Sequence, residues 1–496
     1  MPPTMLLLTV LCATLDAGAS SSEGLAPTAT SEGGAAAAAA AVGDAGVPAT
    51  SQDFFSRLGS AYWQDWTGTL PSAPEAPFRG DPPPVSNPPF PFDYWPYGGS
   101  PTIGAPNNSW TPLMAAIYGG SGGDAWKASG VRIYGWLAGG FNLSSSRASG
   151  FSNAPAAYYA LPNTWMLDQF TLYIERKPDT VQTDHFDWGF RLAQLVGFDY
   201  RYTTMNGIFS NQLLVDNNHI GYDPVMFYVD LYFPVLAGFN IRIGRYISTP
   251  DIEAQLAPDN YSYSHSLLYT YDAYTQMGVL LTLKLDDHWL FQAGISAGND
   301  IAPWVQNAGA QPTATLCVSY TWTQGKDNVY LCANSINNGQ YGYNNVQAYY
   351  ATWYHKFGDG PFHMATEAWF QYEDNVPSIF VPHNSALITG ANGAWCGTGQ
   401  TKCFAPEWAV VNYLEWKVTD HDALTWRNEF VDDIQGQRTG YQTQYFETML
   451  GWAHWIGSTI IMRPEIRFER SFARPAYNNG TSQNQFVTAM DFIFKY

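Results

Sequence analysis

From residue 131 to its end, the 496-residue chain is a series of short segments in which apolar and polar residues alternate. In the segment 186–200, Phe186, Trp188 and Leu192 fall on one parity, whereas Asp187 and Arg191 fall on the other. Successive side chains of an extended strand point to opposite faces, so a period of two predicts a strand with one apolar face.

Sixteen such segments can be counted, and the gaps between them alternate in length. The segments are 131–143, 165–177, 186–200, 224–234, 239–248, 273–285, 288–299, 313–323, 328–336, 345–357, 362–374, 406–418, 422–432, 442–456, 459–469 and 485–496. Long gaps such as 201–223 follow odd-numbered segments, and short gaps such as 286–287 follow most even-numbered ones. Outer-membrane barrels alternate long external loops with short periplasmic turns in this way. The pattern predicts an all-β fold, a transmembrane, antiparallel, up-and-down barrel of sixteen strands closed by the C-terminal strand.

Aromatic residues support a place in the bacterial outer membrane. They make up 16% of the chain, and the chain ends inside a predicted strand, with Phe492, Phe494 and Tyr496 on one face. Aromatic rings favour the depth of the lipid headgroups, where one side is apolar and the other wet. No run approaches the roughly 18 consecutive apolar residues of a membrane-spanning helix.

The polar face of the predicted strands would line the lumen of the barrel. Its charged residues include Arg191, Glu367, Arg427, Glu429, Arg463, Glu465 and Arg467. Burying so many charges in a dry interior would be costly, whereas a water-filled lumen removes that cost. Sixteen strands also give a bore wide enough for an aqueous channel. We therefore expect passive diffusion of ions and small hydrophilic solutes.

The long gap 249–272, after the fifth segment, is rich in apolar and aromatic residues, which is unusual for a loop in water. We expect it to fold inward and narrow the pore, and the alternative is an external loop packed on its neighbours. The constriction would contain Asp251, Glu253, Asp259 and His265 of the loop and Arg242 and Arg245 of the strand before it. A transverse field between such charges disfavours large apolar solutes.

The N-terminal part differs in composition from the rest. Residues 1–19 read as a secretory signal, with an apolar stretch over 5–15 and a small-residue site at 17–19, although no Lys or Arg precedes the apolar stretch. Residues 20–70 are predicted to be a low-complexity Ala/Ser/Gly linker. Residues 71–130 form a segment rich in Pro and aromatic residues, either periplasmic or a plug, and 131–496 the barrel. A buried helix of a soluble protein is the alternative reading of the signal.

Four cysteines remain once the signal, with Cys12, is removed. Cys317 and Cys332 flank a predicted turn at 324–325, which places them opposite each other on two antiparallel strands, because 317 + 332 equals 324 + 325. Cys396 and Cys403 share a short Gly/Thr loop. We favour these two local disulfides among the three possible connectivities, with four free thiols as the alternative. The spacing does not suggest a metal site.

The run GRYISTPDIEAQLAPDNYSYSHS resembles the OmpL-like β-barrel porins of Gram-negative bacteria. The matching positions are Gly244, Arg245, Thr249, Glu253, Pro258, Asn260, Tyr263, Ser264, His265 and Ser266. The proline-rich PPFPFDYWPYGGSPTIGAP before the barrel is similar to the N-terminal segment of the family. Asp251-Ile252 stands where a glycine-aromatic pair is more usual, and Ala273 to Gln276 replace a proline-phenylalanine-threonine-histidine stretch. The resemblance implies an outer-membrane channel and names no substrate.

Other classes of protein fit the sequence less well. The net charge of −19 disfavours a nucleic-acid partner. The run Ser264-His265-Ser266 is compatible with a serine hydrolase. However, the sequence does not identify a carboxylate that would orient His265, and no G-x-S-x-G motif occurs. A secreted acidic carbohydrate-active enzyme would need a carboxylate pair such as Glu465 and Glu469. A barrel that does not conduct is the third alternative. We expect no enzyme activity and no cofactor. We also expect contact with membrane lipid, a weak cation preference and, from the strand count, a homotrimer.

Overall fold

The computed structural model describes residues 53–70, 78–80, 103–107, 110–322, 325–381 and 393–496. The expected signal, 1–19, and the expected linker before residue 53 lie outside the described residues. Within the described residues, no helix is both long and apolar enough to cross a membrane.

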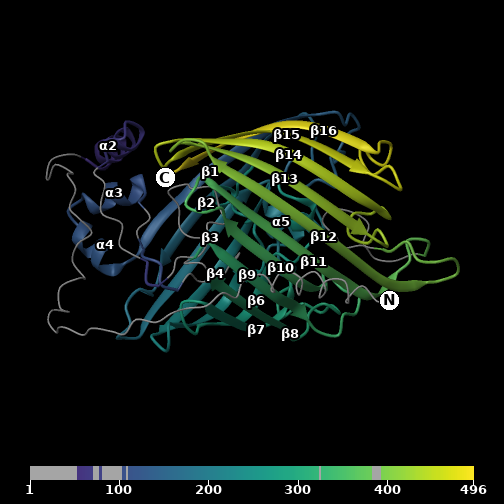
Figure 1. Ribbon diagram of the computed structural model, residues 1–496, viewed down its shortest axis with the longest axis horizontal. Helices are drawn as coiled ribbons and strands as arrows, with labels where there is room; N and C mark the ends of the chain where they lie inside the picture. The colour runs from purple at the N-terminus through teal and green to yellow at the C-terminus, as the bar shows by residue number, and fades with distance from the viewer. Residues whose placement is uncertain (1–52, 71–77, 81–102, 108–109, 323–324, 382–392) are drawn as a thin grey trace, which may run out of the picture. The chain divides into compact units, whose positions relative to one another are not determined.

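Sixteen strands form one closed barrel, in which each strand pairs antiparallel with its neighbours in sequence and β1 pairs with β16 (Figure 1). The strands are β1 (Arg132–Ser144), β2 (Trp165–Arg176), β3 (Asp187–Gly197), β4 (Gly221–Phe233), β5 (Phe239–Ile247), β6 (Thr275–Lys284), β7 (Trp289–Asn299), β8 (Thr313–Trp322), β9 (Asp327–Ile336), β10 (Gln347–Lys356), β11 (Phe362–Pro377), β12 (Lys402–Lys417), β13 (Asp422–Asp433), β14 (Thr443–Ile456), β15 (Ile460–Ser471) and β16 (Asn484–Lys495). The predicted fold class is confirmed, including closure by the C-terminal strand.

The two faces of the wall differ as the alternation predicts. On β15, Ile466 is 45% exposed on the outer face, whereas Arg467 beside it is 1% exposed on the inner face. A closed barrel leaves no strand edge with unpaired backbone groups, which is what a lipid environment requires.

The third strand is shorter than predicted. It ends at Gly197, and the short helix α5 (Tyr200–Thr203) follows, so Phe198 and Tyr200 are buried rather than on the outer face. At Gly197 the backbone passes so close to β2 that an added Cβ would lie 2.1 Å from the carbonyl oxygen of Asp168. The backbone then leaves the strand direction, and the alternation of 198–200 no longer reports which face a side chain takes.

Within the described residues, three helices precede the barrel: α2 (Phe54–Trp66), α3 (Pro112–Tyr118) and α4 (Gly123–Ser129). The prediction of a linker over 20–70 is therefore wrong for the part from Phe54 to Trp66. Its Ala/Ser/Gly composition ends before Asp53, whose carboxylate caps α2 by accepting hydrogen bonds from the N–H groups of Phe55 and Ser56.

Described parts of the segment 71–130 contact the short turns of the barrel. The Arg79 guanidinium donates hydrogen bonds to the carbonyl oxygens of Thr180 and Ala237, and the Gly104 N–H donates to Thr180 Oγ1. Thr180 and Ala237 belong to the connections between β2 and β3 and between β4 and β5. The proline-rich stretch 81–102 that we considered as a plug lies outside the described residues.

Candidate pore constriction

The connection between β5 and β6 lies inside the barrel. From Ser248 to Tyr274 every residue is buried except Asp259, which is partly exposed. This inward loop contains the single-turn elements η1 (Ala257–Asp259) and α7 (Leu267–Thr270). It hydrogen-bonds to side chains of β2, β11, β12, β13 and β15, so it reaches strands far from its own on the barrel wall.

Carboxylates of the wall accept hydrogen bonds from the backbone of the inward loop. Glu367 on β11 accepts from the Ile252 N–H at 3.0 Å, and Glu465 on β15 accepts from the Ser264 N–H at 3.0 Å. Glu429 on β13 accepts from two successive N–H groups, those of Leu267 at 2.8 Å and Leu268 at 3.1 Å, where α7 begins. Backbone groups that would be costly to bury unpaired are thereby satisfied.

Arginines of the wall donate to the carbonyl oxygens of the same loop. Arg463 donates to Ala257 at 2.7 Å and to Asn260 at 3.0 Å. Arg427 donates to Ser264 and Arg467 donates to His265, each at 2.8 Å. The loop is thus held through its backbone by both signs of charge.

Each of these arginines also pairs with a carboxylate of the wall. Arg427 lies 3.0 Å from Glu447, Arg463 lies 2.5 Å from Asp491, and Arg467 lies 2.7 Å from Glu469. Such bonds, in which both groups are charged, are short and strong. Six of the residues predicted to line the lumen are buried here, and their partners are the loop backbone and other charged side chains: Glu367, Arg427, Glu429, Arg463, Glu465 and Arg467.

The loop residues that sequence analysis selected lie in different environments. Glu253 accepts hydrogen bonds from the Ser266 N–H and from the Tyr413 hydroxyl. Burial, followed by the charges of Asp272 and Glu367, raises the pKa of Asp251 well above its usual value. Asp259, in η1, is the carboxylate among the three that keeps some contact with solvent.

The ring of His265 contacts the rings of two tyrosines in the interior of the barrel. Its ring centroid lies 3.7 Å from that of Tyr158 and 5.0 Å from that of Tyr269, and its Nε2 lies 2.8 Å from the Ala254 carbonyl oxygen. Burial holds the pKa of His265 well below its usual value, so the neutral ring is favoured. The neighbouring Ser266 hydroxyl caps α7 by accepting from the Tyr269 N–H. These contacts of His265 and Ser266 pack the loop in the interior of the barrel. None of them joins His265 to a serine hydroxyl.

The two arginines that we expected opposite the loop carboxylates are each paired with an aspartate of β4. Arg242 lies 2.9 Å from Asp230, and Arg245 lies 2.8 Å from Asp223. Arg191 is likewise paired, at 2.7 Å from Glu175. Asp223 was missed in the sequence because the fourth strand was predicted to begin at residue 224, whereas β4 begins at Gly221.

Two further residues of the loop site were also missed. Gln169 on β2 accepts from the Ala257 N–H at 3.0 Å and donates to the Gln255 carbonyl oxygen at 2.8 Å. Tyr413 on β12 is 1% exposed and contacts Glu253. The parity of both residues within their strands indicates the inner face, but their uncharged side chains gave no reason to select them.

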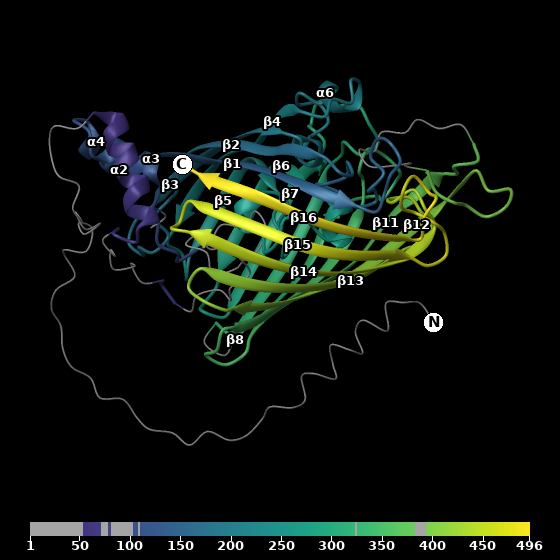
Figure 2. The ribbon, with the colours of Figure 1, turned by 90° about the horizontal axis from the view of Figure 1, so that it is seen from above.

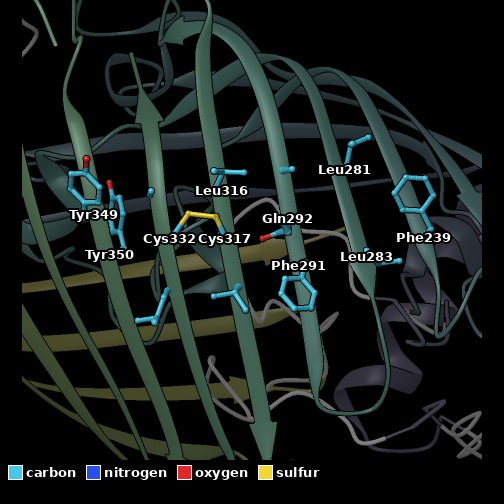
Figure 3. Close-up of a pocket in the computed structure, with 14 residues that line it drawn as sticks. Phe239, Leu281, Leu283, Phe291, Gln292, Leu316, Cys317, Cys332, Tyr349 and Tyr350 are labelled. Atoms are coloured by element: carbon cyan, nitrogen blue, oxygen red, sulfur yellow. A yellow bond between two sulfur atoms is a disulfide. The ribbon is translucent and has the colours of Figure 1, made fainter. Parts of the chain in front are cut away.

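The structure joins the cysteines in the two local pairs. Cys317 on β8 and Cys332 on β9 are direct register partners, with their sulfur atoms 2.00 Å apart. Figure 3 shows this disulfide among side chains of the neighbouring strands. Residues of β5–β10 line an apolar hollow of about 700 Å³ here. The Thr249 hydroxyl of the inward loop lies 3.5 Å from Cys317 Sγ. The second pair, Cys396 and Cys403, has an S–S distance of 2.16 Å and joins the connection after β11 to the start of β12.

A closed sixteen-strand barrel with an apolar outer face, a charged inner face and an inward loop has the architecture of an outer-membrane porin. The chain matches the family described as putative beta-barrel porin-2, OmpL-like, over residues 130–496. It belongs to this family, and the resemblance noted in the sequence is confirmed. The protein is accordingly placed in the bacterial outer membrane.

Several solved structures are similar to this chain at low sequence identity. The anion-selective porin from Comamonas acidovorans has a TM-score of 0.49 and 8% identity, over 74% of this chain and 99% of that one. The outer membrane channel DcaP of Acinetobacter baumannii has a TM-score of 0.46 and 11% identity, over 74% and 97%. The trimer form of OmpT of Vibrio cholerae has a TM-score of 0.45 and 12% identity, over 74% and 99%. No curated protein matches the sequence.

Proposed function

We propose that this porin lets ions and small hydrophilic solutes diffuse passively and that the inward loop, residues 248–274, sets the limiting cross-section. The observation that carries the proposal is the fixing of the loop backbone by Glu367, Glu429 and Glu465 and by three wall arginines. A loop held at so many points is a fixed constriction rather than a mobile lid. No substrate has to be turned over, and we propose no catalytic role for Ser264, His265 or Ser266.

We further propose a weak preference for cations. Among the buried residues of the strands, acidic side chains outnumber basic ones, and most of the basic ones are paired with an acidic neighbour. Burial raises the pKa of the loop carboxylates Asp251 and Glu253, which disfavours their charged forms, whereas Asp259 keeps contact with solvent. Its field favours cations at the constriction. Charges on the outer loops matter little, because they are screened within about 8 Å at physiological salt.

Neutralising the three loop carboxylates tests this selectivity. The variant D251N/E253Q/D259N is expected to lose most of the potassium-over-chloride preference of the unsubstituted channel, and D259N alone is expected to account for most of that loss. The measurement is the reversal potential of single channels in a salt gradient, repeated at high salt, where the preference should shrink. D359N, in the short turn between β10 and β11, serves as the control. An ion preference that is the same in the triple variant and the unsubstituted protein would contradict the assignment.

We also propose a homotrimer, because a shared wall would cover outward-facing aromatic and aliphatic side chains.

A barrel that does not conduct is the second candidate function, and the almost complete burial of the inward loop is the observation that favours it. Single-channel conductance separates this candidate from the first.

A further inference from the structure

Helix α2 exposes large aromatic side chains outside the barrel. Phe55 is 79% exposed, Trp63 67% and Trp66 40%. Positions 55, 59, 62, 63 and 66 fall on one stripe of a helix of 3.6 residues per turn. Gly59, within this stripe, has open space where a Cβ would stand. Three exposed rings on a single 13-residue helix form an apolar surface that calls for a partner.

The helix is fixed to the end of the barrel that carries the short turns. The Asp65 carboxylate accepts from the Ser458 N–H at 2.8 Å and from the Thr459 hydroxyl at 2.7 Å, in the turn between β14 and β15. The Tyr62 hydroxyl donates to the Lys495 carbonyl oxygen at 3.1 Å, at the end of β16. Gly457 is required for this contact, because a Cβ there would lie 2.3 Å from Asp65 Oδ2. The orientation of the stripe is therefore set by the barrel.

The stripe continues the outer face of the barrel. The ring of Tyr62 stacks on that of Phe494 with centroids 5.1 Å apart, and Phe494 is an outward side chain at the end of β16. Ile456, at the end of β14, faces outward at the same end. Figure 2 shows α2 beside the C-terminal end of β16. The rings of α2 thus lie next to the aromatic belt of a membrane-spanning wall, at the level where that wall leaves the lipid.

We propose that α2 is an interfacial anchor whose aromatic stripe lies in the headgroup region of the leaflet next to the short turns. The partner is phospholipid. Amphipathic helices that lie in this plane bury rings such as Trp and Phe at the boundary between headgroups and acyl chains. Arg57, the one basic residue of the helix, donates to the Ala116 carbonyl oxygen of α3. The contact with lipid therefore rests on apolar burial and does not depend on anionic headgroups.

Spin labelling of the full-length porin in lipid vesicles tests the anchor. A nitroxide is attached at W63C, and its collision rates with dissolved oxygen and with a water-soluble nickel chelate are measured. L450C, on the outer face of β14, is the lipid reference, and D184C, in the exposed turn between β2 and β3, is the aqueous reference. The unsubstituted chain, treated in parallel, gives the background of its own cysteines.

The expected result is that the W63C label is more accessible to oxygen and more shielded from nickel than the D184C label, but less so than the L450C label, because headgroup depth lies between water and the hydrocarbon at mid-strand. The result should be the same in vesicles of phosphatidylethanolamine alone and in vesicles with added phosphatidylglycerol. Nickel accessibility equal to that of D184C would place the stripe in water and overturn the proposal. Shielding from both reagents would indicate a second copy or another protein and would also overturn it. If W63C fails to fold, F55C gives the same test from the other end of the stripe.

Discussion

Replacing Glu429 by alanine is expected to raise the single-channel conductance at least about twofold and to make the open current noisy. Glu429 holds the backbone N–H groups of Leu267 and Leu268, and each hydrogen bond to a charged group contributes about 1.5–3 kcal/mol. Without these bonds the loop loses its contacts with Glu429 where α7 begins and gains freedom to move in the lumen, while Arg427 of β13 still holds the loop at Ser264. The variant removes side-chain contacts of Glu429 with Glu447 and Arg467, but it leaves the backbone pairing of β13 with β12 and β14 unchanged, so the barrel still forms.

A second buried carboxylate provides the matched control for this variant. Glu415 on β12 is also on the inner face, but its carboxylate accepts from Thr425 of the neighbouring strand. The E415A variant is expected to conduct like the unsubstituted protein. Equal conductance of E429A and the unsubstituted channel would mean that the loop does not limit the current.

Replacing Asp223 by alanine is expected to lower the free energy of unfolding by about 3–5 kcal/mol, as found when one member of a buried ion pair is removed. Asp223 on β4 makes two hydrogen bonds with Arg245 on β5, at 2.8 and 3.0 Å, and neither side chain is more than 1% exposed. The variant leaves a guanidinium buried with only the carbonyl oxygens of Pro224 and Thr203 as partners. Denaturant unfolding in detergent micelles, followed by tryptophan fluorescence, measures the loss.

An exposed ion pair of the same chain sets the scale for that measurement. Asp359 lies 2.6 Å from Lys326, but its side chain is 94% exposed. The D359A variant is expected to unfold close to the midpoint of the unsubstituted protein, because exposed pairs are solvated when broken. If D223A also unfolds at that midpoint, the inner wall at Asp223 is wet and the pair is not buried.

The barrel could be predicted because the alternation of apolar and polar residues that indicates each strand is local in the sequence. Each strand repeats the same alternation, and the register that brings Cys317 opposite Cys332 follows from the turn between them. Where the backbone leaves the strand direction, as after Gly197, alternating residues no longer indicate a strand. The predicted strand therefore ends later in the sequence than β3 does. Helix α2 was missed because the composition of the residues before it was extended across Phe54–Trp66.

The interior of the barrel was less predictable than its wall. Alternation indicates that Arg427 and Glu429 face inward, but not whether they meet water or another part of the chain. Their contacts with the inward loop join residues more than 160 positions apart, as between Leu268 and Glu429. No local pattern encodes such a contact, and the apolar content of 249–272 indicated only that the loop avoids water.

Single-channel recording of the full-length protein in planar lipid bilayers tests the central claim most directly. The material should first be shown to be folded by its heat-modifiable migration on a gel. The account predicts discrete, reproducible current steps that remain open at low voltage, as expected for a water-filled pore narrowed by a fixed loop. A folded, heat-modifiable barrel that inserts into the bilayer and passes no current would contradict it.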